Sequence, residues 1–225
     1  MKKKIVLILF FVVPIAAYLV LRTGKNDYKQ LEILGPKEPI KKTINGKEVI
    51  DTLYHTVGGF SFYDQDSILV TEKVTEGSIY VVDFFFATCK TICPKMSNQL
   101  MRVQHNFKTD DDVKILSFTV DPLNDTPAQL KKYATKHNAI PGKWYFLTGD
   151  KVKIYSIAKE SYFLTAMEDS AMEEGFLHSE QMVLVDKEKR IRGFYDGTDI
   201  FEVKKLIEDI ATLKVAYASE KKKEK

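Results

Sequence analysis

Apolar residues gather in short blocks along this chain, and the blocks predict a central sheet covered by helices. Residues 79–86 are β-branched and aromatic almost without a break, which is typical of a strand buried on both faces of a sheet. Residues 113–120 form a second apolar run of the same kind. Shorter strands are expected at residues 60–63, 68–70, 144–147, 182–185 and 191–195.

The helices are indicated by apolar residues at helical spacing and by capping residues. After Pro94, one apolar residue recurs at steps of four, three and four, which predicts a single buried helical face made by Met96, Leu100, Val103 and Phe107.

Three polar residues mark the starts of further helices. Thr126, followed by Pro127, predicts one helix, and Asp150 and Asp199 are expected to cap two more. The resulting order is hairpin, strand, helix, strand, helix, strand, helix, hairpin, helix. This order is that of an α/β thioredoxin-like domain, with a central mixed sheet flanked by helices.

The first residues read as a membrane-targeting segment. Residues 5–21 contain no charged residue and follow three lysines, Lys2 to Lys4. No small-x-small cleavage site follows them, although Ala16-Ala17 keeps cleavage open, so residues 1–22 are interpreted as a retained transmembrane signal anchor. The lysines then stay in the cytoplasm, and the domain lies on the periplasmic or extracytoplasmic side of the cytoplasmic membrane.

Length and charge limit the rest of the chain. The 225 residues, 44% hydrophobic, suffice for one globular core, expected at residues 60–215. Residues 23–59 are polar and rich in turn signals, as in a linker that merges into the domain edge, and residues 216–225 read as a charged tail. Because the small net charge of +3 is concentrated in lysines at the two ends, no nucleic-acid face is expected.

The only two cysteines, Cys89 and Cys93, follow the predicted strand at residues 79–86. Open α/β sheets bind ligands at the carboxyl ends of their strands. Because Pro94 fits the first turn of a helix, Cys93 is expected to be the N-cap, where free N–H groups and the helix dipole favour a thiolate. Lys90 adds a positive charge between the sulfurs, so both thiols are expected to ionise easily.

A Cys-x-x-x-Cys pair alone leaves several chemistries open. Structural zinc requires a second pair of ligands, which the sequence lacks. Catalytic zinc would require a general base near the metal, and none is evident in the sequence. Copper(I) is soft and is satisfied by two thiolates and one imidazole. A redox pair of thioredoxin type is expected to have two intervening residues and a proline before the facing strand, and neither is present.

His178 precedes the expected strand at residues 182–185, where that proline would stand. The order of the sheet returns it beside the cysteine loop, although spacing alone leaves a metal ligand and a hydrogen-bonded loop histidine equally open. His55 is interpreted as a surface residue, and His137 as a partner of a helix dipole. Residues 162–177, before His178, are interpreted as a mobile flap.

Three blocks of sequence resemble the SCO/SenC copper chaperones. They are residues 84–96 (FFFATCKTICPKM), residues 120–127 (VDPLNDTP), and His178-Ser179 with the downstream Tyr195-Asp196-Gly197. The resemblance covers about residues 60–213. It implies a thioredoxin-like fold on one membrane anchor, with copper held by Cys89, Cys93 and His178.

The resemblance also implies a role in assembling the binuclear copper-A centre of cytochrome c oxidase. The partners are then the oxidase subunit that carries this centre and a protein that donates copper, as Cu(I) or Cu(II). The resemblance thus favours a metallochaperone over an enzyme. The alternative is a thiol-disulfide oxidoreductase in which Cys89 and Cys93 reduce the copper-ligand cysteines of the subunit. Lys90 replaces a proline common in the family, and Asp121 and Asp125 are candidates for orienting the site.

Overall fold

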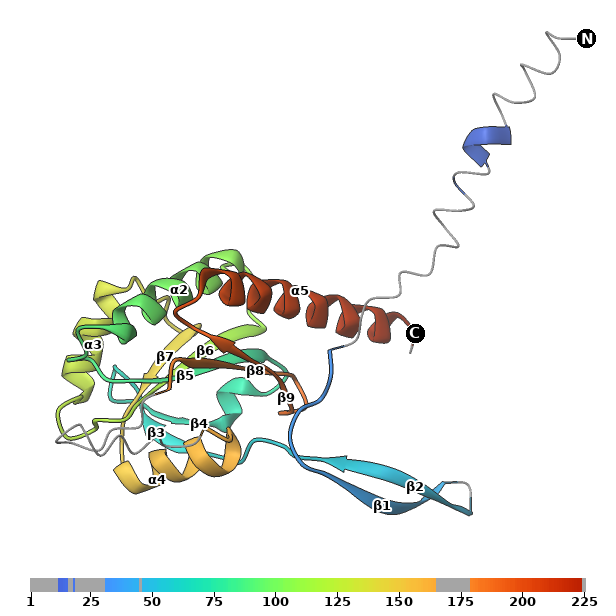
Figure 1. Cartoon of the computed structure of the whole chain (residues 1–225), viewed down its shortest axis with the longest axis horizontal. Helices are drawn as coiled ribbons and strands as arrows, with labels where there is room; N and C mark the ends of the chain where they lie inside the picture. The colour runs from blue at the N-terminus through green and yellow to red at the C-terminus, as the bar shows by residue number, and fades with distance from the viewer. Residues whose placement is uncertain (1–11, 16–17, 19–30, 45, 165–178, 224–225) are drawn as a thin grey trace, which may run out of the picture.

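A five-stranded mixed sheet forms the centre of the protein (Figure 1). The computed structural model describes residues 12–15, 18, 31–44, 46–164 and 179–223. The strands have the order β7-β6-β5-β8-β9, with β5 parallel to β6 and antiparallel to β8. Their bounds are Ile79–Phe85 (β5), Val113–Thr119 (β6), Trp144–Leu147 (β7), Gln181–Val185 (β8) and Ile191–Asp196 (β9).

Strand β5 lies in the middle of the sheet, and every one of its residues is buried. Successive side chains of a strand point to opposite faces. Ile79, Val81 and Phe85 therefore pack into the core on one face, while Tyr80, Val82 and Phe84 pack into the core on the other. This double burial explains why the strand reads as a continuous apolar run, and it confirms the predicted central strand.

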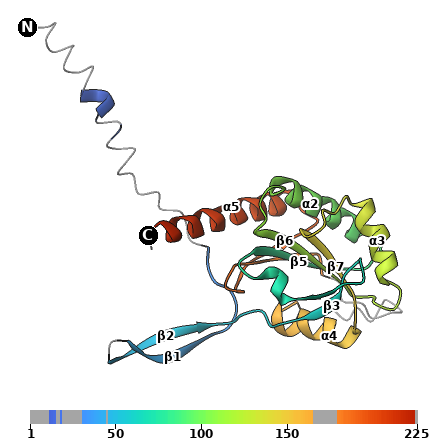
Figure 2. The ribbon, with the colours of Figure 1, turned by 180° about the vertical axis from the view of Figure 1, so that it is seen from behind.

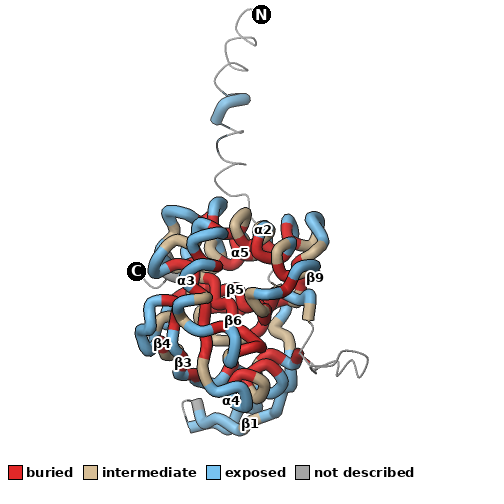
Figure 3. The backbone as a smooth tube through the Cα atoms, turned by 90° about the vertical axis from the view of Figure 1, so that its left-hand side faces the viewer, coloured by how far each residue is buried: buried red, intermediate tan, exposed pale blue. Residues whose placement is uncertain are grey.

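Helices and a small hairpin cover the two faces (Figures 1 and 2). One face carries α2 (Ile92–Asn106), α3 (Pro127–Lys136) and α5 (Ile200–Lys223). The other carries α4 (Lys151–Ser156), the π-helical turn η2 (Ile157–Ser161), the 3-10 turn η1 (Glu72–Thr75) and the hairpin of β3 (Ser61–Tyr63) with β4 (Leu69–Thr71). Figure 3 shows the buried backbone concentrated in β5 and β6, between these layers.

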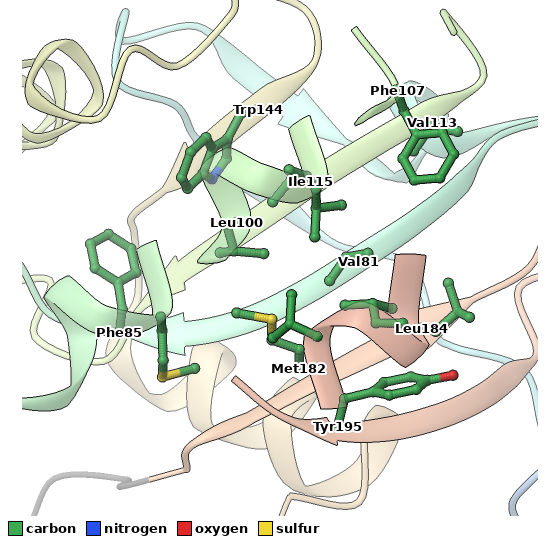
Figure 4. Close-up of a cluster of buried hydrophobic side chains, with 14 of the residues drawn as sticks. Val81, Phe85, Leu100, Phe107, Val113, Ile115, Trp144, Met182, Leu184 and Tyr195 are labelled. Carbon is green, nitrogen blue, oxygen red and sulfur yellow. The ribbon is translucent and has the colours of Figure 1, made fainter. Parts of the chain in front are cut away.

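The predicted apolar face of α2 is confirmed. Met96, Leu100 and Val103 are at most 1% exposed, and Phe107 closes the row. Leu100 packs with Val81 and other side chains of the sheet (Figure 4). Burying an aliphatic side chain of this size stabilises the fold by roughly 1.5–3 kcal/mol, so this row fixes the helix that carries one of the two cysteines.

Two of the predicted caps are also confirmed. The Thr126 hydroxyl accepts a hydrogen bond from the Gln129 N–H, and Asp150 Oδ1 accepts one from the Lys153 N–H at 2.9 Å. Helix α5 begins at Ile200, directly after Asp199, but continues to Lys223, past the boundary expected at residue 215.

Both lateral edges of the sheet have hydrogen-bonded cover. At the start of β9, Ile191 O accepts a bond from Leu34 N at 2.8 Å, and Arg192 donates to the carbonyl oxygens of Leu31 and Glu32. At the other edge, Tyr63 and Thr148 exchange backbone hydrogen bonds just beyond β7. The chain before β1 thus covers one end of the β9 edge, and the hairpin of β3 and β4 covers the chain just beyond β7.

A second hairpin lies in the segment interpreted as a linker. Strands β1 (Lys37–Ile44) and β2 (Lys47–Tyr54) pair along their whole length and project from the body of the protein (Figure 1). Gly46, in the turn, has a φ of 76°, which suits glycine. Because most of the described side chains of the hairpin are exposed, neither strand needs the alternating apolar pattern by which strands are usually recognised.

The predicted membrane anchor and the predicted flap lie largely outside the described residues. Within the described part of the chain, no helix is long and apolar enough to cross a membrane. Most of residues 1–22 lies outside that part. Of the segment interpreted as a flap, Tyr162 and Leu164 are buried, whereas residues 165–178 are not described.

Candidate metal centre

The two cysteines lie where β5 ends and α2 begins. Cys89 belongs to the connecting loop, and Cys93 is the second residue of α2. The N-cap of α2 is Thr91 and not Cys93, so the predicted cap was wrong. The helix starts earlier than expected, and Pro94 still falls in its first turn, where a missing N–H costs no hydrogen bond.

Both cysteines are free thiols and both are largely buried. Cys89 is 9% exposed and Cys93 is 3% exposed. The Cys93 N–H donates to the Cys89 sulfur at 3.4 Å, and the Thr91 hydroxyl lies 3.7 Å from the same sulfur. The sulfur of Cys89 therefore faces the free N–H groups at the start of α2, and the two cysteines belong to one compact turn.

This geometry gives the two thiols opposite acidities. Burial alone raises the pKa of the Cys89 thiol, but hydrogen bonds from the backbone of Cys93 and Thr91 stabilise its thiolate more, so its pKa lies below the ordinary value. Burial raises the pKa of the Cys93 thiol well above the ordinary value, and the neighbouring Cys89 raises it further. The prediction of two easily ionised thiols is confirmed for Cys89 and wrong for Cys93.

Asp125 connects the cysteine loop to the loop after β6. Its Oδ2 accepts hydrogen bonds from the Ala87 N–H at 2.9 Å and from the Thr119 hydroxyl at 2.5 Å. Thr119 Oγ1 in turn accepts one from the Asp121 N–H at 3.0 Å. The Asp125 side chain is fully buried, and burial raises the pKa of its carboxyl. The structure thus brings Asp125 to the backbone two residues before Cys89, as expected of an orienting residue.

A row of buried polar groups crosses the sheet beneath α2. The Trp144 indole N–H donates to the Ser117 hydroxyl at 2.9 Å, and that hydroxyl donates to Asp83 Oδ1 at 2.5 Å. Asp83 is 1% exposed, and burial raises the pKa of its carboxyl to about 7. This residue was not predicted from the sequence. Its signal was a lone charged residue within the otherwise uncharged strand at residues 79–86.

His178, the third predicted ligand, lies outside the described residues, so its place stays a prediction. Val183 of β8 pairs with Val82 of the antiparallel β5. The chain therefore enters β8 from the end of the sheet that carries the cysteine loop, as the sequence analysis expected. Ser179, the first described residue after His178, accepts a hydrogen bond from the Gln181 N–H at 3.2 Å.

Two other histidines, His55 and His137, differ from their predicted surroundings. His55 Nε2 lies 3.0 Å from Ser161 O and its ring packs on Phe163, so it is half-buried rather than a surface residue. His137 is buried at the end of α3, and burial lowers the pKa of its imidazole. A lowered pKa disfavours the charged form, which the predicted interaction with the helix dipole would need. In the part of the chain that the structure describes, no three His, Cys, Asp or Glu residues form a group that could hold a metal.

Comparison with known proteins identifies the family. The SCO1/SenC family model matches residues 50–214. A SCO1 protein homolog from Bacillus subtilis is 33% identical over 167 residues, which cover 73% of this chain and 86% of the relative. Residues 50–214, which the family model matches, include Cys89, Cys93, Asp125 and His178.

Two solved structures show the same fold. BsSco, described as a Sco family cytochrome c oxidase assembly protein with a disulfide switch, has 31% identity and a TM-score of 0.61, covering 71% of this chain and 93% of its own. Copper-bound ScoI from Bradyrhizobium japonicum has 25% identity and a TM-score of 0.57, covering 71% and 98%. The chain belongs to the SCO1/SenC family.

Proposed function

We propose that this protein is a membrane-anchored copper metallochaperone that delivers copper to the copper-A centre of cytochrome c oxidase. Copper is its cargo and not a resident cofactor. The metal is held by the thiolates of Cys89 and Cys93 and by the imidazole of His178, and it leaves by ligand exchange to the oxidase subunit. Residues 1–22 hold the protein in the cytoplasmic membrane, with the domain on the extracytoplasmic side, where a donor protein supplies the metal.

This proposal rests on the two free thiols, Cys89 and Cys93, which lie in one turn at the end of β5. Thiolate ligands select soft metals such as Cu(I), and the N–H groups at the start of α2 already stabilise the Cys89 thiolate. Cys93 loses its proton when a metal binds, because only the thiolate is a ligand. Asp125 holds the loop in place through Ala87. The copper-bound ScoI structure, which has the same fold, supports copper as the metal.

Anaerobic Cu(I) titration of the reduced full-length protein against a competing chelator tests this function. The wild-type protein is expected to bind one equivalent tightly, and the Cys89→Ser, Cys93→Ser double variant none at that affinity. His178→Ala should weaken binding by at least about 10- to 100-fold, since even residues that only support a ligand have effects of that size. His105→Ala, which removes an exposed histidine of α2, is the matched control.

Cu(I) affinity that is unchanged in His178→Ala would contradict the three-ligand site. The second candidate function, thiol-disulfide exchange with the copper-ligand cysteines of the oxidase subunit, would then be favoured. The unequal thiols support it. The Cys89 thiolate attacks the acceptor disulfide to form a mixed disulfide, and the Cys93 thiolate displaces the acceptor thiol. Cys89 and Cys93 are thereby oxidised to a disulfide, and the acceptor is reduced to two thiols.

A further inference from the structure

Strands β1 and β2 form a sheet of only two strands, so each has one edge that no other strand of the described chain covers. Figures 1 and 2 show this hairpin projecting away from the five-stranded sheet and its helices. A hairpin of two strands is marginally stable in water unless it packs on another element or gains a further strand. The two outer edges of the hairpin are therefore candidates for an interaction surface.

The hydrogen bonds of the hairpin alternate along its length, which determines the backbone groups that face outward. The His55 N–H donates to Pro36 O at 3.1 Å, so these two residues form a hydrogen-bonded pair. In an antiparallel ladder, such pairs alternate with pairs whose N–H and C=O groups point away from each other. With the observed register, the outward-facing residues are Lys37, Pro39, Lys41 and Thr43 on β1 and Glu48, Ile50, Thr52 and Tyr54 on β2.

The two outer edges differ in whether they can pair with another strand. Pro39 has no N–H, and it stands on the outer edge of β1, where proline is typical of an edge that is protected from pairing. The outer edge of β2 has no proline. Strand β2 also exposes apolar side chains, since Val49, Ile50 and Leu53 are 43%, 76% and 52% exposed. The edge of β2 is therefore the one that is open to a further strand.

The free backbone groups of this edge are centred on Glu48 and Ile50. The Thr52 N–H, farther along the strand, already donates to Asp51 Oδ1 at 2.8 Å. Two residues of a hydrogen-bonded antiparallel pair exchange both of their backbone bonds. Two copies of β2 can therefore pair about a two-fold axis, with Glu48 of each copy bonded to Ile50 of the other. Each copy then satisfies the outward N–H and C=O groups of both residues.

The charges on β2 agree with this register. With Val49 on the two-fold axis, Lys47 of each copy lies opposite Asp51 of the other, and opposite charges in such positions stabilise a sheet. An axis at Asp51 would set two carboxylates against each other, and an axis at Ile50 would set Lys47 against Leu53. The edge of β2 is thus complementary to itself.

We propose that this edge is an interface between two copies of the protein: their β2 strands pair antiparallel about Val49 and join the two hairpins into one continuous sheet. The β1 strands then form the outer edges of this sheet, where Pro39 opposes the addition of further strands. The assembly therefore closes at two copies, whereas an unprotected edge would let it grow. Because the interface belongs to the hairpin and not to the cysteine turn, it does not depend on copper binding.

Sedimentation velocity of the full-length protein in detergent tests the interface with two proline variants. Ile50 and Lys41 face each other in the hairpin as a pair without mutual hydrogen bonds, so neither Ile50→Pro nor Lys41→Pro breaks a bond within it. Ile50→Pro removes an outward N–H of β2 and is expected to convert the wild-type dimer into a monomer. Lys41→Pro, the matched control, removes an outward N–H of β1 and should stay a dimer. Lys47→Glu, which sets like charges opposite each other, should weaken the dimer.

A cysteine on the two-fold axis tests the register. In the Cys89→Ser, Cys93→Ser background, Val49→Cys brings two thiols together across the axis, and mild oxidation should give a disulfide-linked dimer. Ile50→Cys, one residue along, should link about tenfold more slowly, because it lies opposite Glu48 of the other copy and disulfide geometry is specific.

A wild-type protein that sediments as a monomer at every concentration would refute the interface. A dimer that Ile50→Pro leaves intact would also refute it, because the copies would then meet elsewhere. Loss of the dimer in both proline variants would show that the fold of the hairpin matters and not its edge, which overturns the proposal as well. Equal cross-linking of Val49→Cys and Ile50→Cys would refute the register.

Discussion

Asp83→Asn should stabilise the protein at pH 8 by about 4 kcal/mol more than it does at pH 4. Burial raises the pKa of the Asp83 carboxyl to about 7 in the folded protein, although the Ser117 hydroxyl donates to it, whereas the unfolded chain has the ordinary value near 3.8. Between these values the folded protein binds the proton more tightly. Its free energy of unfolding therefore falls as the pH rises from about 4 to about 7 and is constant above. Asparagine has no such proton to lose, and its side-chain oxygen can still accept from Ser117.

Urea unfolding at several pH values, followed by the fluorescence of Trp144, measures this difference. Trp144 is the only tryptophan, is fully buried and donates to the hydroxyl that bonds to Asp83. The control is Asp111→Asn, which removes the same charge at an exposed position. If the stabilities of the wild type and of Asp83→Asn change in parallel from pH 4 to pH 8, the pKa of the Asp83 carboxyl is not raised by burial.

Cys89 should react with iodoacetamide at least about 100-fold faster than Cys93 in the reduced, copper-free protein at pH 7. The thiolate is the nucleophile, and hydrogen bonds at the start of α2 lower the pKa of the Cys89 thiol despite its burial. Burial raises the pKa of the Cys93 thiol, so this residue is almost entirely protonated and is also 3% exposed. At a fixed pH below the pKa, each unit by which the pKa rises lowers the fraction of thiolate tenfold. Quenched alkylation and peptide mass spectrometry give the two rates.

The same reaction in urea supplies the control, because the two cysteines should alkylate at similar rates once the chain is unfolded. The rate at Cys89 should also reach its plateau at lower pH in the folded protein than in the unfolded chain, as a lowered pKa requires. Equal rates in the folded protein would mean that the turn from Cys89 to Cys93 opens faster than either thiol reacts.

The sequence predicted the elements whose pattern is local. Strand β5 was recognised from a run of apolar residues that is interrupted only by Asp83. Helix α2 was recognised from an apolar residue on every helical turn. The caps of α3 and α4 depend on residues three positions apart, so Thr126 and Asp150 were recognised. The order of these elements was enough to place the cysteine pair at the end of the central strand, and this placement is confirmed.

Features that depend on packing could not be read in this way. The high pKa of the Cys93 thiol comes chiefly from its burial in the folded protein, which the residues next to it in sequence do not reveal. The contact of Asp125 with Ala87 joins two loops whose separation in space is set by the pairing of β5 with β6. Among their described side chains, β1 and β2 have no buried face, so the hairpin lacks the periodic signal of a half-buried strand. The position of His178 stays a prediction.

The covered edges of the sheet determine how another protein can meet this one. A strand with a free edge invites a partner to add a strand of its own. Here Leu34 occupies that position at the start of β9, and Tyr63 of β3 occupies it beyond β7. Strand addition by another protein is therefore blocked at these two positions.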